Sequence, residues 1–597
     1  MTTHAFLPTR PSSWLCPILL ITALLGGNTS ADDAKSADSN RNDQRGAADL
    51  LPATVVAYAH VPQLGDVIGL IADHPLRETI ESMPAFKAFR DSADLTQLRN
   101  GIAAFEGSMG QPWKDALASL TDEGIHVAFD GASRGGALLI KSSSRDQLER
   151  FRSFILAIAQ LGQGNFGIAE QGVYRGYTAY AINDQAKMAL FDNWLLITNK
   201  PELGKSIIDR YIDGDQKSLR SSDQFNSAMK MAGKASATAY VNLDTIRSAG
   251  IAPALYGGKT NNVAAEALVG GIVANLRHTP YAVASLKIRR PGIQLTLATP
   301  HEPQWAAGRD YFFGDDGHSS APALLDLPDQ LFALSAYRDL SQMWLRAPDL
   351  MTDKANEDLA KADSNLTTFF SGRDFGEDIL GSLHPDIQLA VCKQTFDDQS
   401  PLPDIKLPAF ALQFRMRTPE ATTSEFRRVF LSFVGFINVV GAMNGQPQLD
   451  LGFDQVDAAT LVTATYIPPL DDQDTTITPI NYNFSPTLAF AGERMVISSS
   501  SKLARTLVQS SADVDSNEMG SNTHAVLHAD ALADVLRDNK PQLVAQNMLE
   551  KGHSPEQANA EIGLLLDLIN LFRDASMDLD VTDEQLKLTT QLRVKSE

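Results

Sequence analysis

The stretch WLLITNKPELGKSII at residues 194–208 is matched by the stretch RMVISSSSKLARTLV at residues 494–508. The two align without a gap, and apolar residues meet apolar residues at nearly every position. Each begins with a five-residue run typical of a β-strand, continues through a short turn and ends in an amphipathic helical pattern. A match of this kind, offset by 300 residues, indicates an internal repeat.

Four further pairs of segments occur in the same order along the chain. They are residues 51–68 with 327–344, 113–129 with 376–391, 151–156 with 426–431, and 265–276 with 560–571. Loops that differ in length explain why the offset drifts while the order is kept. We therefore predict one copy at residues 48–300 and a second at 322–597, joined by a linker at 301–321 that is rich in Pro, Gly and Asp.

The strands of each copy come as consecutive pairs, such as 125–129 with 137–140 and 188–191 with 195–198. Consecutive strands predict antiparallel hairpins rather than parallel crossovers. The predicted fold class is α+β: two tandem divergent copies of an antiparallel-sheet domain with helices packed on a face. Leu196 and Ile497, inside the matched strands, are expected in the core.

The N-terminus predicts export. A single charge, Arg10, precedes an apolar run at residues 15–25, and the small residues Thr29 and Ala31 then fit a cleavage site. Residues 1–31 are therefore predicted to be a signal peptide, residues 32–47 a polar, mobile leader, and the protein periplasmic or secreted. The alternative is an uncleaved anchor. The run is short for a membrane helix, so we expect no transmembrane span after cleavage.

Charge and cysteine content restrict the partners and the chemistry. The formal charge is −21, and it becomes −22 without residues 1–31, which carry one arginine and no acid. Such a chain repels phosphate backbones and anionic membrane surfaces, so we expect no nucleic-acid partner. Cys16 precedes the apolar run, which argues against a lipidated cysteine. Cys392 is then the one cysteine left, and its apolar surroundings predict a buried small hydrophobe.

Two polar motifs suggest catalysis or metal binding, and neither is compelling. Ser499 and Lys502 have the Ser-x-x-Lys spacing of penicillin-binding folds, but residues 498–501 also suit the N-cap of a helix. His524 and His528 have a spacing that suits zinc on a helix, but their segment has the pattern of a strand and no third ligand follows.

Three further segments have plain structural explanations. Residues 513–524 imitate a calcium loop, but Glu518 replaces the required Gly and His524 the required Glu. Asp471, Asp472 and Asp474 suit a charged loop. The apolar run 429–442 is most simply a helix buried between two layers; alternatively it lines an apolar pocket or a partner interface. We therefore expect no catalytic residue, no metal and no cofactor.

The opening pattern Leu-Leu-Pro-x-Thr-Val-x-Ala-Tyr at residues 50–58 resembles the start of a bacterial exported family known as domain of unknown function 3352. Residues 192–198, followed by Pro201-Glu202-Leu203, are similar to its strand, turn and helix element. The resemblance covers the first copy better than the second, in which residues 332–334 replace the opening Val-Ala-Tyr. It brings no catalytic residues.

Function is the least determined property. The sequence favours an uncharacterised envelope protein that binds or scaffolds without catalysis, with an unknown envelope protein or an apolar ligand as its partner. Two alternatives stay open. One is an exported hydrolase whose site is assembled from distant residues, and the other is an apolar-ligand carrier that uses the helix around Phe433.

Overall fold

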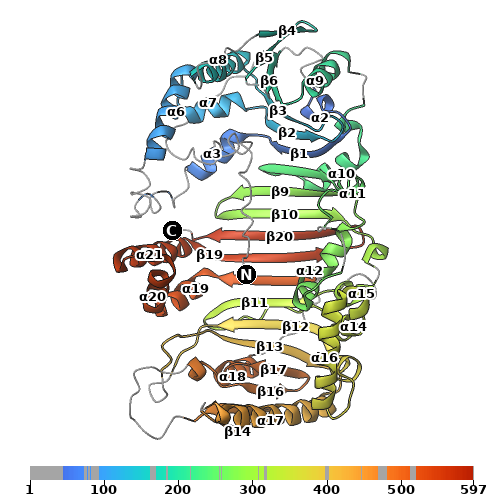
Figure 1. Cartoon of the computed structure of the whole chain (residues 1–597), viewed down its shortest axis with the longest axis vertical. Coiled ribbons are helices and arrows are strands. Elements are labelled where there is room, and N and C mark those ends of the chain that lie inside the picture. Colours follow the sequence, from blue (N-terminus) through green and yellow to red (C-terminus); the bar gives the residue numbers. More distant parts are fainter. Residues whose placement is uncertain are drawn as a thin grey trace, which may run out of the picture. The chain divides into compact units, whose positions relative to one another are not determined.

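The computed structural model is an α+β fold dominated by antiparallel strands (Figure 1), which confirms the predicted class at this level. The structure describes residues 45–72, 77, 81, 93–161, 170–182, 186–214, 217–253, 256, 259–306, 308–314, 319–396, 402–444, 447–467, 480–510 and 520–595. The predicted signal peptide, Cys16, the leader before residue 45, Asp471 to Asp474 and residues 513–517 lie outside these ranges.

The described residues of the first half form ten strands and the helices that follow them. The strands are β1 (Val55–Val61), β2 (Ile125–Asp130), β3 (Gly135–Lys141), β4 (Glu170–Tyr174), β5 (Tyr177–Ala181), β6 (Lys187–Phe191), β7 (Trp194–Thr198), β8 (Ala237–Asn242), β9 (Tyr281–Arg289) and β10 (Gly292–Pro300). The helices of eight or more residues are α3 (Leu64–Ala72), α6 (Ala93–Met109), α7 (Trp113–Leu120), α8 (Arg145–Leu161), α9 (Pro201–Asp213), α10 (Asp223–Ala232) and α12 (Val263–Leu276).

The second half contains another ten strands. They are β11 (Gln330–Tyr337), β12 (Leu383–Cys392), β13 (Ala409–Met416), β14 (Leu449–Val456), β15 (Ala459–Tyr466), β16 (Thr487–Ala491), β17 (Arg494–Ser498), β18 (Thr523–His528), β19 (Phe572–Val581) and β20 (Gln585–Val594). The helices are α13 (Asp310–Phe313), α14 (Leu340–Leu345), α15 (Ala347–Leu350), α16 (Asp353–Phe369), α17 (Pro419–Met443), α18 (Ser501–Gln509), α19 (Ala529–Asp538), α20 (Lys540–Lys551) and α21 (Pro555–Asn570).

The strands pair in the same order in the two halves. The first half runs β4–β5–β6–β7–β3–β2–β1–β8–β9–β10, and the second runs β14–β15–β16–β17–β13–β12–β11–β18–β19–β20. β10 and β20, the last strand of each half, pair antiparallel from Gly292↔Arg593 to Pro300↔Gln585. One hydrogen-bonded seam therefore joins the two sets of strands.

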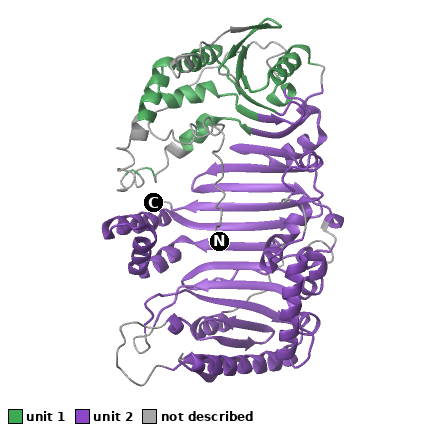
Figure 2. Cartoon of the chain, viewed as in Figure 1, with its two compact units in different colours: residues 1–50, 60–127, 135–216 green, residues 51–59, 128–134, 217–597 purple. Residues whose placement is uncertain are grey.

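Packing divides the chain into two compact units that do not coincide with the two predicted copies (Figure 2). Unit 1 comprises residues 1–50, 60–127 and 135–216, and unit 2 comprises 51–59, 128–134 and 217–597. These boundaries reflect which residues pack together, so they do not show whether the two halves are copies of one domain.

Unit 1 has helices against its strands on both faces. Leu120 of α7 and Leu148 of α8 pack with Ile140 and Leu195 on one face. Helix α9 packs on β3 and β7, and it buries Leu203 and Ile207. Leu196 is 2% exposed, which confirms its predicted place in the core.

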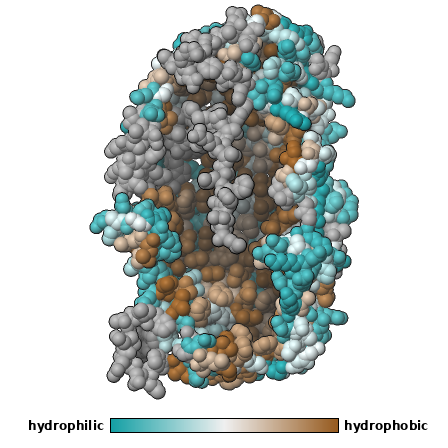
Figure 3. Space-filling model, in the orientation of Figure 1, coloured by the Kyte–Doolittle hydropathy of each residue, from teal (hydrophilic) through white to brown (hydrophobic). Residues whose placement is uncertain are grey.

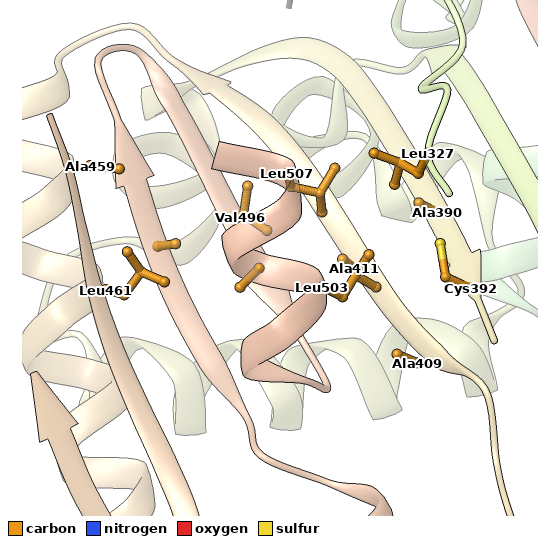
Figure 4. Close-up of a cluster of buried hydrophobic side chains, with 12 residues drawn as sticks. Leu327, Ala390, Cys392, Ala409, Ala411, Ala459, Leu461, Val496, Leu503 and Leu507 are labelled. Atoms are coloured by element: carbon orange, nitrogen blue, oxygen red, sulfur yellow. The ribbon is translucent and has the colours of Figure 1, made fainter. Parts of the chain in front are cut away.

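Unit 2 builds a second core around helix α18 (Figure 4). Leu503, Ala504 and Leu507 of this helix pack on small and apolar side chains of β12, β13, β15, β16 and β17. Cys392 belongs to this cluster and is 6% exposed, and burial raises the pKa of its thiol to about 11. The prediction that it is a buried small hydrophobe is confirmed.

The predicted linker, residues 301–321, holds a buried anchor between α12 and the second half. Glu266 of α12 accepts hydrogen bonds from Arg309 Nε at 3.0 Å and from the Tyr311 hydroxyl at 2.8 Å. The Arg338 guanidinium lies over the Phe312 ring at 3.6 Å and donates to Asn522 Oδ1 at 2.9 Å. All of these side chains are buried, so this segment is part of the core of unit 2.

Helix α21 begins as its sequence predicts. Ser554 accepts a hydrogen bond from the backbone of Gln557, and the Gln557 side chain accepts one from the backbone of Ser554. This reciprocal pair, with Pro555 in the first turn, is a capping box. Ser554 and Pro555 therefore set the first residue of α21.

Two equivalent helices allow a matched test of the anchor. A Cβ added to Gly271 of α12 would lie 2.6 Å from Cγ and 2.9 Å from Cε1 of Phe312, whereas one added to Gly563 of α21 meets nothing within 4 Å. Phe312 cannot move away because Arg338 covers its ring.

We therefore expect Gly271→Ala to lower the free energy of unfolding by about 1–3 kcal/mol through overpacking. Gly563→Ala should raise it by about 0.5–1 kcal/mol, because alanine favours an open helical position. Denaturant titration of both variants checks this, and equal effects at the two positions would contradict the anchor.

Candidate functional site

One face of the sheet of unit 2 exposes apolar side chains, and the pairing register shows which side chains form it. Directly paired residues of antiparallel strands point to the same face. The middle row crosses nine neighbouring strands, β9, β10, β20, β19, β18, β11, β12, β13 and β17. Its members are Leu286, Leu295, Thr590, Met577, Ala525, Leu334, Leu389, Leu412 and Ile497.

A second row lies beside it, two residues along each strand. It consists of Ile288, Ile293, Leu592, Ala575, Leu527, Phe332, Val391 and Phe410. We call these two rows together the apolar floor. Thr590 is its one residue with a polar side chain.

The apolar floor is open. Phe410 is 47% exposed, Ile293 43% and Leu295 39%, and most of the remaining floor residues are half-buried. Figure 3 shows a brown surface recessed between the helices that stand at both ends of these strands, α12 to α16 at one end and α19 to α21 at the other, of which α16, α19 and α20 are hydrophilic. A contiguous apolar surface that is exposed in this way marks an interaction or ligand-binding site.

Directly behind the middle row of the floor, the opposite face of these strands carries a mostly polar row, although farther along β12, β13 and β17 that face forms the apolar core under α18. The row behind the middle row of the floor consists of Ser285, Thr296, Thr589, Asp578, His524, Ser335, Gln388, Gln413 and Val496. An extended segment crosses part of it, because Ser335 donates to the carbonyl of Pro322 and Gln388 donates to that of Ala323. A water-soluble antiparallel sheet normally buries its apolar side chains and solvates its polar ones. Here Leu295 is 39% exposed on the floor, whereas Ser335 and Gln413 in the row behind it are buried.

Helix α17 continues the apolar surface at one end of the sheet. Phe426 and Phe430 pack against Phe414, Met495 and neighbouring side chains on the floor side of β13 and β17. The other side of the helix leaves Phe433, Phe436, Val439, Val440 and Met443 exposed. The prediction that this run is buried between two layers is wrong, because no second layer from the described part of the chain covers the outer side of the helix.

By length and composition alone, α17 is the one helix of the described residues that is apolar enough to cross a membrane. Core helices of soluble proteins and signal sequences pass the same test. Here one side of the helix packs on protein, so the finding describes a strongly apolar helix and no more.

The polar motifs do not assemble into a catalytic site. Ser499 accepts a hydrogen bond from the backbone of Phe410 at 2.9 Å, whereas the Lys502 ammonium contacts Thr395. Ser500, the residue before α18, makes no side-chain capping bond, so the expected serine cap is absent at this position. Ser499 and Lys502 therefore make structural contacts, the first with a strand residue and the second with a loop residue.

His524 lies on the polar face, where both of its ring nitrogens have protein partners. Nδ1 lies 2.7 Å from Asp578 Oδ1, and Nε2 accepts the backbone N–H of Ser521 at 3.2 Å. With Nε2 engaged by a backbone amide, this His–Asp pair has no ring nitrogen directed at a serine hydroxyl. His528 ends β18 and precedes α19, and among the described residues no group of three His, Cys, Asp or Glu side chains is placed to hold a metal ion.

Sequence reasoning missed the apolar floor. Its signal is present in the alternation of Ile293, Leu295 and Leu297 with Gln294 and Thr296, but alternation predicts a two-faced strand without stating what covers each face. Ile497 was expected in the core and is 38% exposed, because its face of β17 is the open one.

Comparison with known proteins adds little beyond a family. A family model described as a protein of unknown function (DUF3352) matches residues 139–423. No curated protein matches the chain. Solved structures of TP0453, crystal forms IV and III, are 12% identical to it, cover 42% of this chain and 79% and 78% of their own, and have TM-scores of 0.23 and 0.22. TM-scores this low carry no weight for fold or function.

Unit 1 contains a cluster of titratable side chains around His126. His126, 6% exposed, stacks on His60 with ring centroids 4.6 Å apart, and its ring lies 5.9 Å from that of Trp194. Burial, with the nearby His60 and Lys141, lowers the pKa of His126 to about 3, and burial also lowers the pKa of His60. These rings are held neutral and structural.

The folded state is therefore expected to lose stability on acidification. Below pH 6.5 the unfolded chain binds a proton at His126, whereas the folded chain does not. The free energy of unfolding therefore falls as pH falls from 6.5 toward 3. Between pH 6.5 and 5 the loss from this residue is about 2 kcal/mol. Denaturant titration at both values should show a smaller loss for His126→Phe, and an unchanged pH dependence would contradict the neutral assignment.

Proposed function

We propose that this chain, which belongs to the DUF3352 family of proteins of unknown function, is a non-enzymatic binding protein that holds an extended apolar ligand on the apolar floor. The single observation that carries the proposal is the open apolar face of the nine paired strands, from Leu286 on β9 to Ile497 on β17.

The cost of leaving this face in water supports a ligand. Full burial of a leucine- or phenylalanine-sized side chain is worth about 1.5–3 kcal/mol, and each floor side chain, at most 47% exposed, forgoes part of this. The neighbouring cores show that the chain can cover such a face, since α17 covers Phe414 and Met495. A partner of low polarity recovers this energy when it lies on the floor.

The chemistry of the floor supports a binding role over the hydrolase alternative. A catalytic pocket needs convergent polar groups, and the floor offers Thr590 alone. The polar side chains of the same strands lie on the opposite face, where Gln413 donates to Gln388 and His524 pairs with Asp578.

We also propose the two-copy organisation that the sequence predicts, because the floor contains strands from both halves of the chain. It is supported by the identical strand order of the two halves and by the antiparallel pairing of β10 with β20. An experimental structure whose halves differ in strand order would rule it out.

The binding proposal is tested with an apolar dye that becomes fluorescent when it leaves water. We expect the double variant Leu295→Asp with Phe410→Asp to bind the dye at least about tenfold more weakly, since two charges replace half-exposed apolar side chains on the floor. Both positions are exposed enough for the fold to tolerate the change.

The matched control is Leu549→Asp on α20, which replaces an 86% exposed leucine off the floor and should leave dye binding unchanged. Circular dichroism and the thermal midpoint establish that each variant is folded. Equal dye binding by the wild type and the folded double variant would refute the floor as the site.

A further inference from the structure

The two rows of the floor define a direction. Both rows run perpendicular to the strands: the middle row from β9 to β17 across eight inter-strand steps, and the second row from β9 to β13 across seven. With strands about 4.8 Å apart, the middle row is roughly 38 Å long. Adjacent rows are two residues apart on each strand, or about 7 Å. The open surface is therefore long and narrow.

The floor also restricts what can lie on it. Its strands use their backbone hydrogen bonds within the sheet, and its side chains offer no partner except Thr590. An extended peptide laid on this surface would leave its own N–H and C=O groups unsatisfied, at a cost of about 1–3 kcal/mol each. A hydrocarbon chain has no such groups, so it fits the length and the chemistry together.

The length exceeds that of one lipid chain. The hydrocarbon core of a bilayer, about 30 Å thick, is two acyl chains placed end to end, and the floor is longer than that. Hydrophilic helices stand at both ends of the strands, α16 at one end and α19 and α20 at the other, and they offer polar surroundings for a headgroup beside the floor (Figures 1 and 3).

We infer that the ligands are amphiphilic lipids with long unbranched chains, and that at least two chains lie end to end across the strands. This inference rests on the proposed function and specifies its ligand class. The middle row is continuous, so a lipid chain bound near β10 leaves the part of the row near β17 free for a second chain.

The test uses the full chain, freed of bound lipid, with alkyl phosphocholines from octyl to hexadecyl at concentrations below micelle formation. Native mass spectrometry counts the chains bound, and titration gives the affinity. We expect two or more hexadecyl chains per protein, and an affinity that rises roughly fourfold for each added methylene.

Substitutions at the two ends of the middle row separate the subsites. Leu295→Asp at β10 and Ile497→Asp at β17 should each reduce the number of bound chains without abolishing binding, and the double variant should lose nearly all of it. Gln294→Asp, the neighbour of Leu295 on the polar face, should keep the wild-type number.

The possible failures are distinguishable. Binding of a single chain that either substitution abolishes would overturn the end-to-end arrangement, as would an affinity independent of chain length. If the wild type binds the apolar dye more tightly than the double variant but binds no alkyl phosphocholine, the floor remains the binding site and the lipid class is overturned. Loss of both would refute the proposed function itself.

Discussion

The pairing of β10 with β20 is the interaction on which the rest of unit 2 depends. Its nine residue pairs, from Gly292↔Arg593 to Pro300↔Gln585, join the last strands of the two halves into one sheet. Because two directly paired residues point to the same face, the apolar side chains of all these strands then lie on one face. A shift of the register by one residue would move them to the other face. Without this seam, Leu286 and Leu295 would not continue the row that passes through Met577, Leu334 and Leu389.

The buried anchor at α12 and α13 stabilises one side of the same sheet. Glu266, Arg309 and Tyr311 satisfy one another in the interior, where an unpaired charge would be costly. Burial lowers the pKa of Arg338, which is nevertheless held by stacking on Phe312 and by hydrogen bonds to Asn522 and Thr523. The anchor packs at the strand ends near Leu579 and Leu588 and leaves the centre of the floor open.

Leaving that centre open is unusual for a chain of this composition. The chain covers apolar faces elsewhere: α8 and α9 cover the strands of unit 1, and α18 covers the small-residue face of β12, β13, β16 and β17. On the floor the helices stand at the strand ends instead. The polar row behind it is engaged in part, by hydrogen bonds to the extended segment at Pro322 and Ala323 and by the His524–Asp578 pair. These features together favour a surface kept for a ligand over an incidental gap.

The sequence by itself determined the local features of this protein. The matched stretches at 194–208 and 494–508 became β7 with α9 and β17 with α18, Ser554 became the cap of α21, and the period-two alternation of residues 293–297 assigned the two faces of β10. These are short-range properties, set by turn chemistry, capping and side-chain alternation. What covers each face was decided by tertiary structure alone. Ile197 is half-buried against the core of unit 1, whereas its counterpart Ile497 is 38% exposed, and one side of the helix at 429–442 lies uncovered. Helices from distant parts of the chain either pack on a face or leave it free. The apolar floor is a property of nine strands brought into register, and no single strand carries it.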